Sequence, residues 1–289
     1  MSCLAARAGC DCAVAQTAAP KSETSAATRY GERMMVVTVS ELYRRRLRYD
    51  EPRTSRAAVA ALLVGLAAVA ALASTAPLYR LHLAGLATTF LIMRWSLYAA
   101  IAAAFLAVIA MTIALRRGSG LAMPLVTLLL VAAAFATPVA KVRQASRVPR
   151  IHDITTDTER PPQFVAVVPL RAGAPNPIAY GGAEIAAQQR SAYPRVQTLT
   201  LPVPPKEAFD RSLAAARGMG WEIIASDPPA GRIEATDTTF WFGFKDDVVV
   251  RVEAAPGGSR VDVRSLSRVG LSDVGTNAAR IEKFLDRAR

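Results

Sequence analysis

Three blocks of the chain contain no charged residue and are long enough to cross a membrane as helices. They are residues 57–79, 95–115 and 118–140, and have 23, 21 and 23 residues. A helix of about 20 apolar residues covers the roughly 30 Å hydrocarbon core of a bilayer. Because three such blocks in series are uncommon in soluble domains, the pattern predicts three N-terminal transmembrane helices over residues 57–140.

A fourth apolar block is shorter. Residues 81–93 lie between Arg80 and Arg94 and number only 13. At about 1.5 Å per residue, a helix of this length does not cross the bilayer. We expect an interfacial or partly embedded segment between the first two spans.

The hydrophobic pattern changes after residue 194. Residues 206–217 and 272–287 have apolar positions at helical spacing, whereas four segments alternate apolar and polar residues or are short apolar runs. The four segments are 221–225, 231–239, 244–254 and 260–269. A further strand is expected at 196–203. The order βαββββα predicts an α+β fold, an antiparallel sheet with helices packed on one face.

Residues 141–194 connect the spans to this domain and are rich in proline and glycine. We expect an extended arm that wraps over the domain, with a short helix near 183–189. The chain thus divides into a basic arm (1–56), a three-helix membrane region (57–140), the extended arm (141–194) and an α+β domain (195–289).

The alternation also predicts which face of the sheet points to the core. Val248, Val250 and Val252 share one face, and the alternate positions are charged. Along the same face toward the 239–243 turn, Asp237 is expected opposite Asp246, and Ser267 beside Asp246. Two carboxylates at a cross-strand distance of roughly 5 Å repel each other unless a neutral or cationic group joins them.

This polar row is the candidate site, a ligand pocket at one end of the sheet roofed by aromatic side chains. The candidate ligand-binding residues are Asp237, Trp241, Phe242, Lys245, Asp246, Ser267, Arg268 and Asp273. Lys245, Arg268, the helix N-terminus near residue 272, a proton or a metal are the candidates to neutralise the pair. The alternative is that the strand ends leave the core, with both carboxylates solvated or bridged to Arg268. A calcium site with Asp273 fits no known loop.

The net charge of +12 does not indicate a nucleic-acid partner once it is divided by region. Residues 1–56 carry 10 Lys and Arg against 6 Asp and Glu, residues 57–140 carry 4 against 0, and residues 141–289 carry 21 against 17. Basic residues concentrate before the first span and at Arg116–Arg117, which marks the cytoplasmic side. Three spans then place residues 141–289 outside, in the periplasm of an inner-membrane protein. The basic residues just after the third span oppose this orientation.

The first 33 residues have a different composition, rich in Ala, Thr and Ser, and contain Cys3, Cys10 and Cys12. We expect this segment to be disordered. A second hypothesis is that translation begins at Met34 or Met35, which would leave a short basic cytoplasmic arm.

The chain lacks the residues or motifs that several kinds of functional site require. The chain has two histidines, His82 and His152, and no cysteine after residue 12, which disfavours thiolate–zinc and Cys/His sites. No nucleophile-elbow or phosphate-loop motif occurs, and no aromatic residues interleave with the arginines as in nucleic-acid binding. We therefore expect no catalytic residue, no metal, no cofactor and no nucleic-acid partner; the expected partners are the lipid bilayer and an envelope protein or small ligand.

Two runs of residues carry a family resemblance. Residues 232–252 read RIEATDTTFWFGFKDDVVVRV, and residues 259–285 continue as SRVDVRSLSRVGLSDVGTNAARIEKFL. From about residue 151 to 285 the chain resembles the domain-of-unknown-function family numbered 1499. The preceding spans resemble those of its membrane-anchored bacterial members. This resemblance implies no assigned activity or site residue.

The sequence therefore favours a multi-pass inner-membrane protein whose periplasmic domain binds a ligand or an envelope partner. One alternative is a hydrolase or lyase that uses Asp237 and Asp246 as an acid/base pair. The other is a purely structural role in membrane assembly.

Overall fold

The structure, a computed structural model, describes residues 54–289. Three long helices come first: α2 (Arg56–Arg80), α3 (Leu86–Arg117) and α4 (Ala122–Ala145). Their best windows have mean hydropathies of 2.4, 2.4 and 2.0, so each is long and apolar enough to cross a membrane. The expectation of three candidate spans is confirmed. The expected disorder, the alternative starts and the cysteines lie outside the described residues.

The short apolar block 81–93 does not form a separate segment. Helix α3 begins at Leu86 and continues for 32 residues through Arg94, so most of the block is the first part of α3. Only residues 81–85 form a turn between α2 and α3. Residues 86–94 contain neither Gly nor Pro, so nothing in them ends the helix before the second apolar block.

Helices α2 and α3 pack through small side chains. Ala61 and Ala68 of α2 and Ala103 and Ala107 of α3 are almost fully buried. A Cβ atom added at Gly65 would lie 3.3 Å from Cγ2 of a threonine on α4 and 3.6 Å from an alanine Cβ on α3. Gly65 thus lets three helices approach closely, as small residues do in membrane bundles.

The C-terminal domain has the predicted βαββββα order. It contains β2 (Leu199–Leu201), α6 (Pro205–Gly218), β3 (Glu222–Asp227), β4 (Arg232–Thr238), β5 (Lys245–Ala255), β6 (Gly258–Ser267) and α7 (Thr276–Ala288). The sheet is antiparallel in the order β1-β6-β5-β4-β3, where β1 (Asp153–Thr155) comes from the preceding arm, and β2 also pairs with β6. The expected α+β class is confirmed.

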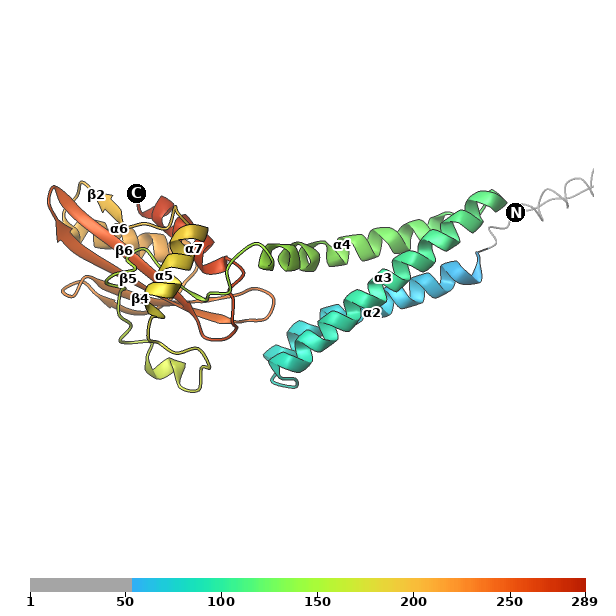
Figure 1. The fold of residues 1–289 in the computed structure, drawn as a ribbon, viewed down its shortest axis with the longest axis horizontal. Helices are drawn as coiled ribbons and strands as arrows, with labels where there is room; N and C mark the ends of the chain where they lie inside the picture. Colours follow the sequence, from blue (N-terminus) through green and yellow to red (C-terminus); the bar gives the residue numbers. More distant parts are fainter. Residues whose placement is uncertain (1–53) are drawn as a thin grey trace, which may run out of the picture. The chain divides into compact units, whose positions relative to one another are not determined.

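Helices α6 and α7 cover one face of this sheet (Figure 1). The core between them contains the alternate valines of β5 that face these helices, together with Phe209 of α6, Trp221 before β3 and Phe284 of α7. The Trp221 and Phe284 rings stack with centroids 5.2 Å apart. The face predicted from Val248, Val250 and Val252 is therefore the core face.

The arm after α4 adds an edge strand to the sheet, and its residues around Phe164 and Val167 cover the opposite, charged face. It contains β1 (Asp153–Thr155), a single 3-10 turn η1 (Pro169–Arg171) and α5 (Gly182–Ala192), the last near the helix expected at 183–189. Phe164 and Val167 of the arm form a second small core with Val249 and Leu266 of the sheet. As a result, charged residues that alternate with the core valines are buried too, among them Glu234, Asp262 and Arg264.

Charged groups on this second face are paired with the arm. The Arg264 guanidinium donates to both carboxylate oxygens of Asp153, at 2.9 and 2.7 Å. The Glu234 carboxylate accepts hydrogen bonds from the backbone N–H groups of Val165 and Val167, each at 3.0 Å. These bonds replace the water that the charged groups lose when the arm covers them.

Candidate functional site

Asp237 and Asp246 lie directly opposite each other on β4 and β5, in the predicted register. Ser267 pairs with Asp246 on the other side, also as predicted. Between the two carboxylates lies the guanidinium group of Arg280 from α7. It donates to Asp237 Oδ2 at 2.7 Å and to Asp246 Oδ2 at 2.6 Å. Arg280 and Asp246 are buried, so the group that neutralises the pair belongs to the core of the domain.

Arg280 is not among the cations predicted from the sequence, which are Lys245 and Arg268. The Lys245 ammonium instead lies 3.7 Å from the Glu222 carboxylate on the edge strand β3, across β4. Arg280 does have a signal in the sequence: with Asn277, Ile281 and Phe284 it follows the helical spacing of the buried face of α7. An arginine within such a face needs a buried acidic partner.

A frame of uncharged polar groups holds Arg280 in place. Ser265 Oγ lies 3.0 Å from Arg280 Nη1 and donates to Asn277 Oδ1 at 2.8 Å. Asn277 Oδ1 also accepts from Arg280, and its Nδ2 donates to Ser267 Oγ at 3.0 Å. The polar row predicted on the inner face is therefore a closed hydrogen-bonded network between the sheet and α7.

The next residue along β5, Asp247, points to the opposite face and is also paired with arginines. It accepts hydrogen bonds from Arg268, with distances of 2.8 and 2.9 Å, and from Arg171 of the arm at 2.6 Å. Burial alone would raise the pKa of Asp247, but the bonds from Arg268, Thr236 and Arg171 outweigh it and lower the pKa. Arg268 therefore pairs with a carboxylate on the face covered by the arm and not with the Asp237–Asp246 pair.

Asp273 lies at the start of α7 and binds the backbone of that helix. Its carboxylate accepts hydrogen bonds from the N–H groups of Gly275 at 3.0 Å and Asn277 at 2.6 Å. Burial raises the pKa of Asp273, and the nearby Asp246 carboxylate adds to the rise, against the effect of these two bonds. Val274, between Asp273 and Gly275, has a φ of 54°, a left-handed conformation that is unfavourable for a β-branched residue. Such strain concentrates at functional sites and at tightly fixed turns.

Trp241 and Phe242 contact the first two candidate membrane-spanning helices. Trp241 Nε1 donates to Thr75 Oγ1 of α2 at 3.3 Å. The ring of Phe242 lies 6.2 Å from that of Tyr79 at the end of α2 and 5.9 Å from that of Phe90 on α3, measured between centroids. These two residues of the β4–β5 loop thus extend the domain toward the ends of two candidate spans.

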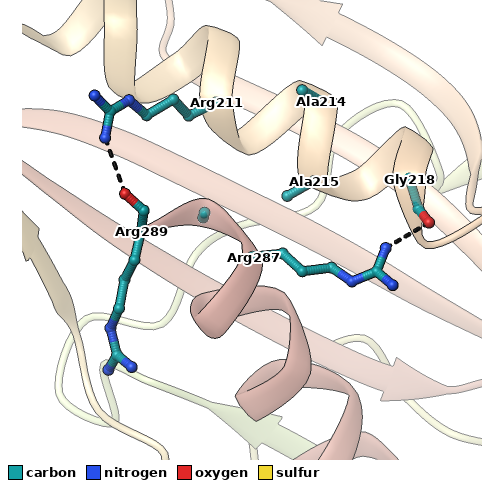
Figure 2. Close-up of a pocket in the computed structure, with 7 residues that line it drawn as sticks. Arg211, Ala214, Ala215, Gly218, Arg287 and Arg289 are labelled. Atoms are coloured by element: carbon teal, nitrogen blue, oxygen red, sulfur yellow. Dashed lines mark hydrogen bonds between the residues drawn. The ribbon is translucent and has the colours of Figure 1, made fainter.

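A shallow hollow of about 480 Å³ lies between the ends of α6 and α7, with Arg211, Arg287 and Arg289 around it. Figure 2 shows that their guanidinium groups point in different directions. Arg211 donates to the main-chain oxygen of Arg289, Arg287 to the carbonyl of Gly218, and Arg289 to Asp286. This arrangement holds the two helices together and does not form a convergent anion site.

Among residues 54–289, no group of three or more His, Cys, Asp or Glu side chains is arranged to hold a metal ion. His82 lies in the turn after α2, and His152 precedes β1, where its Nδ1 is 3.5 Å from the carbonyl oxygen of Leu271. The two histidines are therefore in different parts of the described chain.

The fold defines an α+β domain that follows three candidate membrane-spanning helices. Residues 153–287 match the model of the family described as protein of unknown function (DUF1499). Neither curated proteins nor solved structures gave a match to the chain. The family description names no activity, so the function has to be argued from the site.

Proposed function

We propose that the protein is a multi-pass protein of the bacterial inner membrane whose periplasmic C-terminal domain binds a ligand or an envelope partner without catalysis. The observation that argues against catalysis is the position of Arg280 between Asp237 and Asp246. The Arg280 guanidinium takes up the space between the two carboxylates, where a substrate would have to lie for them to act as an acid/base pair.

The distribution of basic residues supports the proposed orientation. Residues 1–56 contain 10 Lys and Arg, and Arg116–Arg117 end α3, whereas the basic residues near the opposite connection are only Arg80, at the end of α2, and Arg94, within α3. Short loops rich in Lys and Arg remain in the cytoplasm. Three spans then carry the domain to the periplasmic side.

A thermal-shift screen of the full-length protein in detergent tests the proposed binding role. Divalent metal ions, phospholipids, peptidoglycan fragments and small metabolites are the compounds to use. We expect at least one envelope component to raise the melting temperature, and Asp246→Asn to leave any weak chemical turnover unchanged. If the protein turns over one of these compounds and a folded Asp246→Asn variant does not, that result supports the hydrolase or lyase alternative instead.

The third function, a purely structural role through the spans, makes a different prediction. Removal of residues 151–289 would then leave the phenotype of the intact gene unchanged. If the domain is the binding part, that truncation removes the function, provided that the remaining three helices reach the membrane in normal amounts.

A further inference from the structure

The β4–β5 loop, residues 239–244, carries an unusually exposed aromatic residue. Phe240 is 90% exposed, whereas its neighbours Trp241 and Phe242 are turned toward α2 and α3. A single exposed phenylalanine needs no explanation by itself. Phe240 is informative because of what the rest of its loop contacts.

The loop is fixed at the end of a candidate membrane span. The guanidinium of Arg80, the last residue of α2, donates to the carbonyl oxygens of Thr239 and Phe240. Trp241 reaches Thr75, five residues earlier on the same helix. At 1.5 Å per residue, Thr75 lies about 7.5 Å further along α2 than Arg80, toward the bilayer. The loop therefore overlaps in depth with the charge-free part of α2.

The residues around this contact have the composition of a membrane interface. The rings of Phe242 and Phe244 stack with centroids 5.0 Å apart, and Tyr79 lies edge-on to both. In the turn after Arg80, Leu81 and Leu83 are 66% and 71% exposed. Aromatic residues concentrate at the level of the lipid headgroups, and arginine reaches from there to the phosphates.

We infer that the β4–β5 loop is a membrane-docking element, with the Phe240 side chain in the interfacial zone of the phospholipid bilayer and Arg80 beside the headgroups. The occupant of this surface is lipid, because the loop is continuous with the ends of two spans. The inference rests on the membrane-spanning role of α2 and α3 in the proposed function, but not on ligand binding by the domain. Such docking would hold the domain against the membrane surface.

Spin labels on the full-length protein in phospholipid vesicles test this inference. Cys3, Cys10 and Cys12 are replaced by serine, and one cysteine is placed at a time by Phe240→Cys, Ala230→Cys or Phe105→Cys. Ala230 is an exposed residue in the β3–β4 turn, at the opposite end of β4. Phe105 is 67% exposed near the middle of α3 and reports the hydrocarbon core. Each label is measured for collisions with oxygen, which enters lipid, and with a water-soluble nickel chelate.

The expected ratio of oxygen to nickel collisions at position 240 lies between those at 230 and 105. A ratio at 240 equal to that at 230 overturns the inference. Protection of 240 from both reagents also overturns it, because the loop would then be covered by protein, such as a second copy of the chain. If position 105 itself shows the ratio of position 230, the proposed membrane-spanning role has failed rather than the docking of the loop.

Discussion

Arg280 and its two carboxylates show how single residues hold the domain together. A buried arginine is stable only when its charge and its donors are satisfied, and here Asp237, Asp246, Ser265 and Asn277 do both. The same rule holds on the other face, where Asp247 is joined to Arg171 and Arg268. Two consecutive acidic residues of β5 thus connect the sheet to α7 on one side and to the arm on the other.

Substitution of Arg280 is expected to be strongly destabilising. Arg280→Met leaves the buried carboxylate of Asp246 and the partly exposed carboxylate of Asp237 without their shared cation, and loss of one partner from a buried ion pair costs about 3–5 kcal/mol. The free energy of unfolding, measured in detergent with chemical denaturant, gives this value. Lys283→Met, at an exposed position of the same helix, is the matched control and should change it by less than about 0.5 kcal/mol.

A rescue experiment separates charge from packing. Adding Asp237→Asn and Asp246→Asn to Arg280→Met removes the unpaired charges and should restore part of the lost stability. Equal stability of the single and triple variants would show that Arg280 acts mainly by filling space.

The pKa of Asp247 predicts a dependence of stability on pH. Because its folded-state pKa is below the unfolded value of about 3.9, its stabilising effect is complete above that value and is lost as the pH falls through the folded pKa. We expect Asp247→Asn to lower the melting temperature strongly at pH 7, and the difference from the unmodified protein to shrink below pH 4. Asp210→Asn, at an exposed site, should show no such convergence. A difference for Asp247→Asn that stays constant down to pH 2.5 would contradict this assignment.

The strained turn before α7 gives a prediction with an internal control. Val274 has a φ of 54°, so Val274→Gly removes strain of about 1 kcal/mol and should raise the melting temperature. Gly275→Ala has the opposite effect, because Gly275 has a φ of 77° and its new Cβ would lie 3.3 Å from the Gln144 side chain. Differential scanning calorimetry of both variants distinguishes them. A lower melting temperature for Val274→Gly would mean that its side chain stabilises the turn more than its backbone strains it.

Among the elements, the strands of the sheet and their register could be predicted from the sequence. For the arm, only an extended course and one short helix could be predicted. Alternation along β4, β5 and β6 predicted the core face and the pairing of Asp237 with Asp246, because strand periodicity is local. The burial of Glu234 and Arg264 was not predictable in this way, since it depends on contacts with residues 153–180 that lie about 70 to 110 positions away. For the same reason the sequence showed the two carboxylates but not the arginine that joins them.

We expect the packing of the arm against the sheet to depend on Glu234. Glu234→Ala leaves the N–H groups of Val165 and Val167 without their acceptor, and each unsatisfied buried donor costs about 1–3 kcal/mol. Loosening of the arm should expose the buried Arg171 to trypsin, which is measured by the rate of cleavage after this residue. Glu222→Ala, on the exposed edge strand β3, is the control and should be cleaved at the unmodified rate. Equal rates for both variants would show that other contacts hold the arm.

At the scale of the whole molecule, three apolar helices lead to one folded domain, and the location of that domain decides what it can meet. The basic residues before α2 and at Arg116–Arg117 place the N-terminus in the cytoplasm in our proposal. A domain on the periplasmic side, with its aromatic loop at the bilayer, would act on components of the cell envelope. A domain in the cytoplasm would need a different function.

Reporter fusions after Arg289 test this central claim most directly. Alkaline phosphatase is active only after export, and green fluorescent protein exported in unfolded form does not become fluorescent, so the two reporters give opposite signals on the two sides. We expect an active phosphatase fusion and a dark fluorescent-protein fusion. A fluorescent fusion after Arg289 with an inactive phosphatase would place the domain in the cytoplasm and contradict the proposed orientation.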